Sequence, residues 1–150
     1  MADGPGGALR ETVAARLRRA NQRVTANREA IVAALSAAAR PITIPEILEM
    51  PGGRGLAQSS VYRNLLVLEQ AGLVHRIVTD AEFARYELAE DLTEHHHHLI
   101  CANCGMVEDV PAGAGLEQSV DAAANQIARS TGFRTQRHRV DLVGLCARCA

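Results

Sequence analysis

Two C-x-x-C pairs near the end of the chain constrain its fold most strongly. Cys101 and Cys104 form the first pair, and Cys146 and Cys149 form the second, with 41 residues between the pairs. Four thiolates are the donor set of a closed tetrahedral zinc site, which would tie the last strand to the turn at the first pair. A redox-active dithiol and free cysteines are the alternatives, but the sequence lacks the βαβ pattern that accompanies thioredoxin-like chemistry. We therefore predict structural Zn2+ at these cysteines.

Four consecutive histidines, His95–His98, precede the first cysteine pair. Alternate side chains of a strand face opposite sides of a sheet, so the run predicts two metal sites rather than one. A solvated polar strand and a cloning tag are the alternatives. The further ligands have to come from elsewhere in the chain. We expect one set that bridges the two parts of the chain, made of His75, Glu87, His96 and His98. We expect a second set made of His95, His97, Glu117 and His138.

The charges divide the chain into a basic half and an acidic half. Residues 9–63 hold nine Arg against four acidic residues, whereas residues 64–150 hold seven Arg against twelve. A basic half beside an acidic, ligand-rich half indicates a nucleic-acid reader joined to a metal-binding module, with chance asymmetry as the alternative. No apolar run is long enough to span a bilayer and no signal peptide is visible, so we expect a cytoplasmic protein without membrane contact.

Helical and then alternating apolar patterns predict an α+β fold that begins with a winged helix-turn-helix. We expect residues 1–9 to be a disordered leader. Thr25 and Thr43 are predicted N-caps, and the expected helices span residues 12–20, 26–39, 45–50 and 58–71. Two strands, at residues 73–78 and 83–88, are expected to form a hairpin through residues 79–82. Together these elements make a winged-helix domain over residues 10–88.

The remaining third of the chain is predicted to be a separate small domain. Residues 89–94 are polar and acidic, and we interpret them as a hinge. Residues 95–150 then form a small α/β domain. Its expected strands span residues 95–100, 106–110 and 139–145, and its helix spans residues 116–131.

The helix at residues 58–71 is the predicted DNA-reading element. The second helix of a helix-turn-helix lies in the major groove and presents its N-terminal residues to base edges. The hydroxyls of Ser59 and Ser60 suit phosphate contacts, Tyr62 can contact a thymine methyl group, and Arg63 suits phosphate or guanine. The arginines expected to contact the backbone or the minor groove are Arg19, Arg23 and Arg28. An ordinary helical surface is the alternative.

Taken together, these motifs resemble the ferric uptake regulator (Fur) family of metal-responsive bacterial repressors. The resemblance spans residues 10–150. It is carried by Arg23-Val24-Thr25-x-x-Arg28, Ser60-Val61-Tyr62-Arg63-Asn64-Leu65, Ala71-Gly72-Leu73-Val74, Tyr86-Glu87-Leu88, His95 to Gly105, and His138 to Cys149. It implies a homodimer with an N-terminal winged helix and a C-terminal dimerisation domain.

The resemblance also implies roles for individual residues. Tyr62 matches the tyrosine that contacts thymine, and Arg23 matches the basic residue that enters the minor groove. The four cysteines match the structural zinc site. Glu87, His96 and His98 match the interdomain sensor. The residues that match the site within the dimerisation domain are His95, His97, Glu117 and His138.

Departures from the family pattern bear on the regulatory metal. His97 stands where many iron-type members carry Asp, and nitrogen in place of oxygen favours zinc. Arg40-Pro41 occupies the turn where many members carry a sensor His. His75 falls where zinc-type members place a ligand on the wing. The zinc-type Cys expected after the wing is missing, and its substitutes are Glu87, Glu90 or Asp91.

We therefore predict a metal-activated transcriptional repressor that binds palindromic A/T-rich double-stranded operator DNA as a homodimer and is not an enzyme. The expected regulatory metal is Zn2+, followed by Fe2+, and then by Mn2+ or peroxide sensing. A zinc-dependent hydrolase is an alternative from another class, and it would use Glu87, Glu94 or Glu117 as general base. The winged-helix order argues against it. Metal storage, a third alternative, does not explain the recognition helix.

Overall fold

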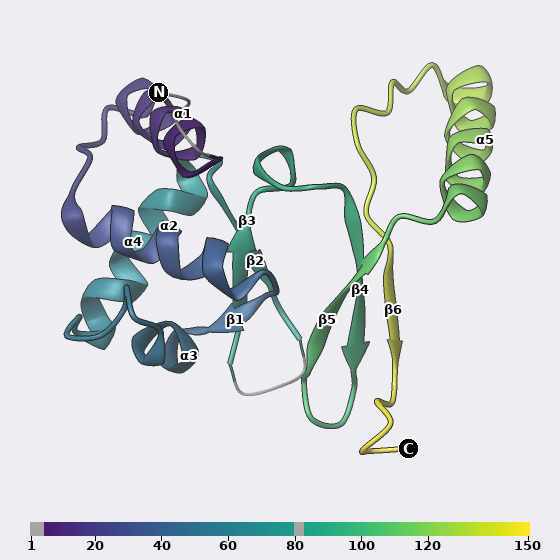
Figure 1. The fold of residues 1–150 in the computed structure, drawn as a ribbon. Coiled ribbons are helices and arrows are strands. Elements are labelled where there is room, and N and C mark those ends of the chain that lie inside the picture. Colours follow the sequence, from purple (N-terminus) through teal and green to yellow (C-terminus); the bar gives the residue numbers. More distant parts are fainter. Residues whose placement is uncertain (1–4, 80–82) are drawn as a thin grey trace.

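The computed structural model describes residues 5–79 and 83–150 and contains two small sheets. Figure 1 shows helices gathered on one side of the first sheet and a single helix at the opposite end of the molecule. The N-terminal winged-helix domain consists of α1 (Pro5–Arg19), α2 (Ala26–Ala38), β1 (Ile42–Thr43), α3 (Ile44–Glu49), α4 (Gln58–Gln70), β2 (Val74–Ile77) and β3 (Arg85–Leu88). A 3-10 turn, Glu90–Leu92, follows it. The C-terminal domain consists of β4 (His96–Cys101), β5 (Val107–Pro111), α5 (Ala114–Thr131) and β6 (Asp141–Gly144).

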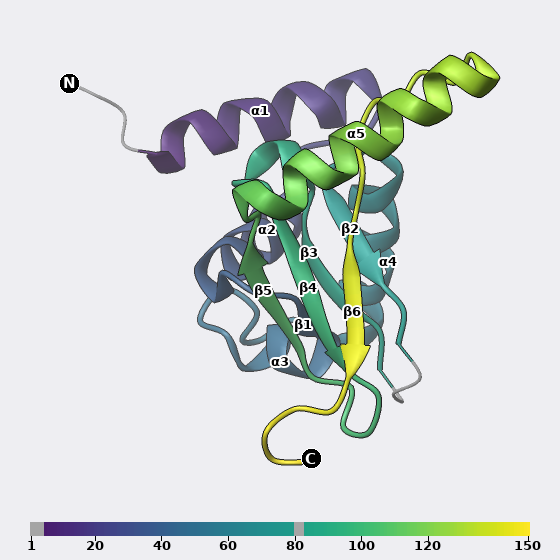
Figure 2. The same cartoon turned by 90° about the vertical axis from the view of Figure 1, so that its right-hand side faces the viewer.

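The two sheets face each other at the centre of the molecule. The first is antiparallel, in the order β1-β3-β2. The second has the order β5-β4-β6, with β4 antiparallel to β5 and parallel to β6. Figure 2 shows the second sheet in front of β2 and β3, with α5 lying across one end of the strands. The strand that carries the histidines is therefore the central strand of the C-terminal sheet.

Side-chain caps set the starts of α2 and α3, as predicted. The Thr25 hydroxyl accepts a hydrogen bond from the backbone N–H of Arg28 at 3.3 Å. Thr43 and Glu46 form a reciprocal capping box, in which the Glu46 carboxylate accepts the Thr43 backbone N–H at 2.8 Å. Each cap satisfies backbone donors that the first helical turn leaves without partners.

Aliphatic side chains fill the core of the N-terminal domain and hold α4 in place. Val61, Leu65 and Leu68 of α4 are fully buried in this core. The turn before α4 passes so close to α3 that a Cβ atom on Gly53 would lie 1.8 Å from the Ile47 carbonyl oxygen. Glycine is therefore required at position 53. Because the apolar face of α4 is buried in the core, its polar face points outward.

Some element boundaries differ from the sequence expectations. Helix α1 begins at Pro5, so residues 5–9, expected in a disordered leader, are helical, and Leu9 packs against the core. Strand β1 was not predicted, because two residues are too few to show an alternating pattern. The expected turn at residues 79–82 and the first four residues fall wholly or mostly outside the described part of the chain. Within that part, no helix has the length and apolar character needed to cross a bilayer.

Candidate metal sites and DNA-reading surface

Three groups of metal-ligand side chains lie in or beside the C-terminal sheet. Within each group the ligand atoms all lie within 4.8 Å of one another. One group contains Cys101, Cys104, Cys146 and Cys149. Another contains Glu87, His96, His98 and Asp109, and the last contains His95, His97, Glu117 and His138.

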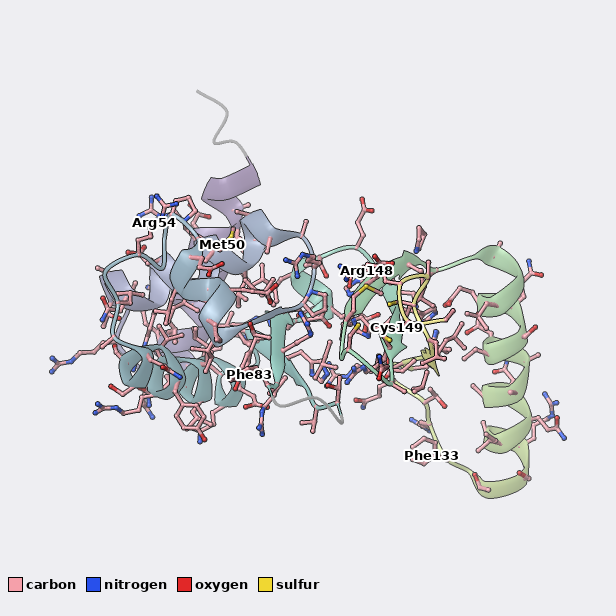
Figure 3. All side chains as sticks on the ribbon, turned by 90° about the horizontal axis from the view of Figure 1, so that it is seen from below. Met50, Arg54, Phe83, Phe133, Arg148 and Cys149 are labelled. Carbon is pink, nitrogen blue, oxygen red and sulfur yellow. The ribbon has the colours of Figure 1, made fainter. Side chains whose placement is uncertain are left out.

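Strand pairing brings the four cysteines together. Cys101 ends β4 and lies opposite Gly144 of the parallel strand β6, so the residues that follow β6 reach the turn after β4. The backbone N–H of Cys146 donates to the Cys101 sulfur at 3.4 Å. Backbone N–H groups of Cys104 and Cys146 lower the pKa of the Cys101 thiol to about 6. Figure 3 shows Cys149 and Arg148 beside the C-terminal sheet.

The cysteine geometry fits a tetrahedral zinc ion. Zinc–sulfur bonds of about 2.3 Å in a tetrahedron place the sulfurs about 3.8 Å apart. The Cys104 and Cys146 sulfurs are 3.8 Å apart. All four ligands are thiols that lie within one small sphere, so the donor set leaves no coordination position for a substrate.

The second group joins the two domains. Glu87 lies on β3 of the N-terminal domain, whereas His96, His98 and Asp109 lie on the C-terminal sheet. The His96 Nε2 atom is 3.0 Å from Glu87 Oε2. The His98 Nε2 atom is 3.1 Å from Glu87 Oε1 and 3.2 Å from Oε2. Separations of about 3.0–3.4 Å are those expected between nitrogen and oxygen ligands of one first-row metal.

Contacts on the far side of each imidazole orient the two histidines. His96 Nδ1–H donates to the Glu94 carbonyl at 2.8 Å, and His98 Nδ1–H donates to Asp141 Oδ1 at 3.0 Å. Metal-binding histidines characteristically donate their second ring N–H in this way. Because Nδ1 keeps its proton in both rings, loss of the Nε2 protons on metal binding would leave two lone pairs directed at the position between His96, His98 and Glu87.

The carboxylates of this group also fit a cation. Asp109 Oδ1 is buried and has no hydrogen-bond partner among the described residues. Burial raises the pKa of Asp109. Burial acts the same way on Glu87, but hydrogen bonds from His98 and His96 hold the pKa of Glu87 below its usual value. A shared positive charge would compensate both partly buried carboxylates.

Asp109 stands in this group where we expected His75. The imidazole of His75 lies beside the group but contacts the Arg139 guanidinium through Nε2, so it does not reach the shared centre. Burial and then Arg139 lower the pKa of His75. Asp109 is brought in because β5 pairs with β4 in the register that sets it opposite His98. In the sequence, the only indication of this role for Asp109 is that it is an acidic residue shortly after the first C-x-x-C pair.

The third group surrounds one carboxylate with three imidazoles. His97, only 2% exposed, has its Nε2 atom 2.6 Å from Glu117 Oε1. The Nε2 atoms of His95 and His138 lie 3.1 Å and 3.0 Å from Glu117 Oε2. The hydrogen bond from His97, followed by His138, lowers the pKa of Glu117. Three imidazoles and one carboxylate form a set that zinc accepts readily.

The two histidine groups occupy opposite faces of β4, which is what a strand requires. The His95 and His97 ring centres are 4.9 Å apart on one face. Those of His96 and His98 are 5.1 Å apart on the other. The four-residue run therefore contributes to two clusters, each completed by residues far away in the sequence.

The expected DNA-reading residues lie on or beside the outward face of α4. Ser59, Tyr62 and Arg63 are exposed on this helix, and Tyr62 retains 48% of its accessible surface. Arg19 and Arg23 are exposed at the end of α1 and in the loop after it. These side chains are free to meet a nucleic acid.

Ser60 and Arg28 are more enclosed. The Ser60 hydroxyl accepts hydrogen bonds from the side-chain amides of Asn27 at 3.4 Å and Asn64 at 3.3 Å. Arg28 donates to Asn64 and to the Arg23 carbonyl. These two residues are engaged within the domain rather than projecting from it.

Comparison with known proteins gives a consistent result. The sequence model of the ferric uptake regulator family matches residues 19–143. The peroxide operon regulator of Bacillus subtilis is 29% identical over 136 residues, which cover 89% of this chain and 88% of the relative. A ferric uptake regulation protein of Cupriavidus metallidurans is 38% identical over 94 residues, which cover 63% of this chain and 59% of the relative.

Solved structures share the fold. The ferric uptake regulator of Pseudomonas aeruginosa with manganese has a TM-score of 0.68 at 27% identity, covering 89% of this chain and 96% of that chain. The ferric uptake regulator of Helicobacter pylori has a TM-score of 0.75 at 23% identity, covering 96% and 93% of the two chains.

Proposed function

This chain belongs to the ferric uptake regulator family, a family of metal-responsive transcription regulators rather than enzymes, and from that premise we propose how it works. We propose that it is a repressor, which binds operator DNA as a homodimer when a divalent metal occupies the cluster of Glu87, His96, His98 and Asp109. The cysteine cluster holds structural zinc in this proposal.

The observation that carries the proposal is the division of this cluster between two domains. Glu87 belongs to the wing of the DNA-reading domain, and its three partners belong to the C-terminal sheet. A bound cation would neutralise the two carboxylates and favour the arrangement in which the domains share it. Through Glu87 the cation would hold the wing, and through His96 and His98 it would hold the C-terminal sheet. A ligand shifts such an equilibrium only by binding one arrangement better than the other.

The donor set bears on which metal is sensed. Two imidazoles and two carboxylates suit Fe2+ and Mn2+ as well as Zn2+, whereas the expectation of zinc relied partly on His75 as a third nitrogen. We therefore propose Fe2+ as the regulatory metal. Zinc is the second candidate, because sites of nitrogen and oxygen bind zinc more tightly than iron at equal free metal.

Exposed apolar surface in the C-terminal domain supports the homodimer. Neither α5 nor β6 contains a buried residue, although both carry large apolar side chains. An open groove of about 520 Å³ runs beside β6. The most exposed apolar side chains of this region are Leu116, Ile127, Phe133, Leu142, Val143 and Leu145. Figure 3 shows Phe133 at the opposite end of the molecule from Met50 and Arg54, so a partner seated there leaves α4 accessible.

The exposed face of α4 supports major-groove reading. Tyr62 and Arg63 project from the N-terminal half of the helix, where helix-turn-helix proteins contact bases. Arg19 and Arg23 add positive charge beside this face. A dimer would present two such faces to a palindromic site.

A gel-shift titration on the DNA of the protein's own promoter tests the proposal. Protein that retains its cysteine-bound zinc is titrated separately with Fe2+, Mn2+ and Zn2+ under reducing, anaerobic conditions. The proposal expects metal-dependent binding to this DNA and not to a scrambled duplex. It also expects that Fe2+, at a buffered free concentration, promotes binding to the promoter DNA while the scrambled DNA stays unbound. The absence of metal-dependent, sequence-specific binding would overturn it.

A further inference from the structure

Arg28 lies where α2, α4 and the loop between α1 and α2 meet. Its Nε–H donates to Asn64 Oδ1 of α4 at 3.1 Å. Its Nη1–H donates to the carbonyl of Arg23 at 2.5 Å. Its own backbone N–H is bound by the N-cap Thr25. One guanidinium thus connects the recognition helix to the loop that carries Arg23.

Asn64 extends this connection along α4. Its side-chain amide donates to the backbone carbonyl of Ser60 at 2.9 Å and to the Ser60 hydroxyl at 3.3 Å. Asn27 of α2 donates to the same hydroxyl at 3.4 Å. A polar layer between α2 and α4 therefore lies next to Val61 and Leu65, whose side chains are buried in the core.

The geometry of the guanidinium suits this task. Its donors lie in one rigid plane, so two acceptors at fixed positions hold it in a single orientation. The ammonium of a lysine is a point donor on a flexible stem and does not span both acceptors in the same way. The half-buried position of Arg28 further separates its role from that of the exposed Arg19 and Arg63.

We propose that Arg28 is a positioning residue for DNA recognition rather than a phosphate contact. It fixes the distance between the base-reading face of α4, with Tyr62 and Arg63, and the loop at Arg23. The proposal rests on the proposed function, because it presumes that α4 reads operator DNA. It departs from the sequence expectation that Arg28 itself contacts DNA.

The first test compares Arg28→Met with Arg19→Met, which also removes one positive charge from the N-terminal domain. Affinity is measured by fluorescence anisotropy for a promoter duplex and a scrambled duplex of equal length, across a salt series. Loss of a phosphate contact weakens both duplexes equally and reduces the salt slope by about 0.9. For Arg28→Met we expect a loss of about tenfold to a hundredfold on the promoter duplex and a much smaller loss on the scrambled one.

Arg28→Lys separates charge from geometry. The proposal expects this variant to bind the promoter duplex about as poorly as Arg28→Met. Promoter affinity equal to that of the wild-type protein in Arg28→Lys would overturn it. An equal loss on both duplexes in Arg28→Met, with the reduced salt slope of Arg19→Met, would also overturn it.

A double-mutant cycle tests the link without DNA. Urea unfolding is measured for Arg28→Met, Asn64→Ala and the combined variant. The proposal expects the combined variant to lose less stability than the sum of the two single losses, because the Arg28–Asn64 hydrogen bond is removed in both single variants whereas the contacts with Arg23 and Ser60 are not shared. Additive losses would overturn it. This cycle remains informative if the wild-type protein binds no operator, so failure of the proposed function is distinguishable from failure of this proposal.

Discussion

Glu87 and His98 approach to 3.1 Å although they belong to different domains. Glu87 lies on the wing strand β3, and His98 lies on the central strand of the C-terminal sheet. The Glu87 side chain is 11% exposed and that of His98 is 4% exposed, so the contact is shielded from water. In the proposed function, a cation bound at this point would therefore act on the relative position of the two domains.

Asp109, and not His75, is expected to complete the regulatory site. Asp109→Asn should weaken binding of the regulatory metal by at least about tenfold, because it removes a partly buried anionic ligand. His75→Ala should change metal affinity by less than about threefold, since its imidazole faces Arg139. Competition with a chelator of known affinity measures both. A larger loss of metal affinity in His75→Ala than in Asp109→Asn would show that His75, and not Asp109, is the ligand.

This difference between expectation and structure has a simple origin. Alternation along β4 could be read from the sequence, and it separates His95 and His97 from His96 and His98 correctly. The residue that pairs with His98 could not be read from the sequence, because the pairing depends on where β5 begins after the turn at Gly105. Asp109 becomes a neighbour only once that register is set.

The structural cysteine site is tested by Cys104→Ser. We expect this variant to lose cysteine-bound zinc and the folded C-terminal domain, because three thiolates and a hydroxyl hold zinc poorly. Elemental analysis and circular dichroism measure the two losses. Ala102→Ser introduces the same hydroxyl into the same turn and should retain both. If the Cys104→Ser protein keeps its zinc and melts at the same temperature as wild type, the four cysteines do not have the structural role assigned to them.

Glu46 gives a pH-dependent prediction. Burial opposes its charge, but the Thr43 backbone N–H and Arg40 hold the pKa of Glu46 below its ordinary value of 4.5. A lowered pKa adds stability above the unfolded-state pKa, and that stability is lost as pH falls through the folded-state pKa. Glu46→Gln should therefore unfold more easily than wild type at pH 7, by about 1 kcal/mol.

The same comparison at acidic pH should show a smaller difference in unfolding free energy, because the stability due to the charged carboxylate is lost as the pH falls through the lowered folded-state pKa of Glu46. Urea unfolding of both proteins at each pH measures it. Glu49→Gln, on the exposed face of the same helix, is the matched control and should show little difference at either pH. If the difference in unfolding free energy between Glu46→Gln and wild type stays constant with pH, the charge of Glu46 does not contribute to stability.

Helix caps illustrate what sequence alone could establish. Thr25 and Thr43 could be predicted as N-caps because a side-chain acceptor stands at the start of each helical pattern, whereas the reciprocal bond from Glu46 became visible only in the structure. The inward role of Arg28 could not be identified in this way. It depends on Asn64, which is 36 residues away and approaches only after α2 and α4 have packed.

The exposed face of β6 provides a test of the dimer. Val143 is 66% exposed, and Val143→Glu should weaken self-association at least about a hundredfold, since a carboxylate would be buried at the interface without a partner. Val78→Glu alters a valine of the N-terminal domain that is 69% exposed and should leave the association unchanged. Sedimentation equilibrium distinguishes the two. Equal effects would place the interface elsewhere.

The ratio of operator affinities with and without the regulatory metal tests the central claim most directly. Fluorescence anisotropy is measured on the promoter duplex for wild type, Glu87→Gln and the control Glu94→Gln, all with cysteine-bound zinc. The account predicts that metal raises wild-type affinity about 5- to 150-fold, a normal range for coupled sites. It predicts the same rise in Glu94→Gln and almost none in Glu87→Gln. A full metal response in Glu87→Gln would contradict the account.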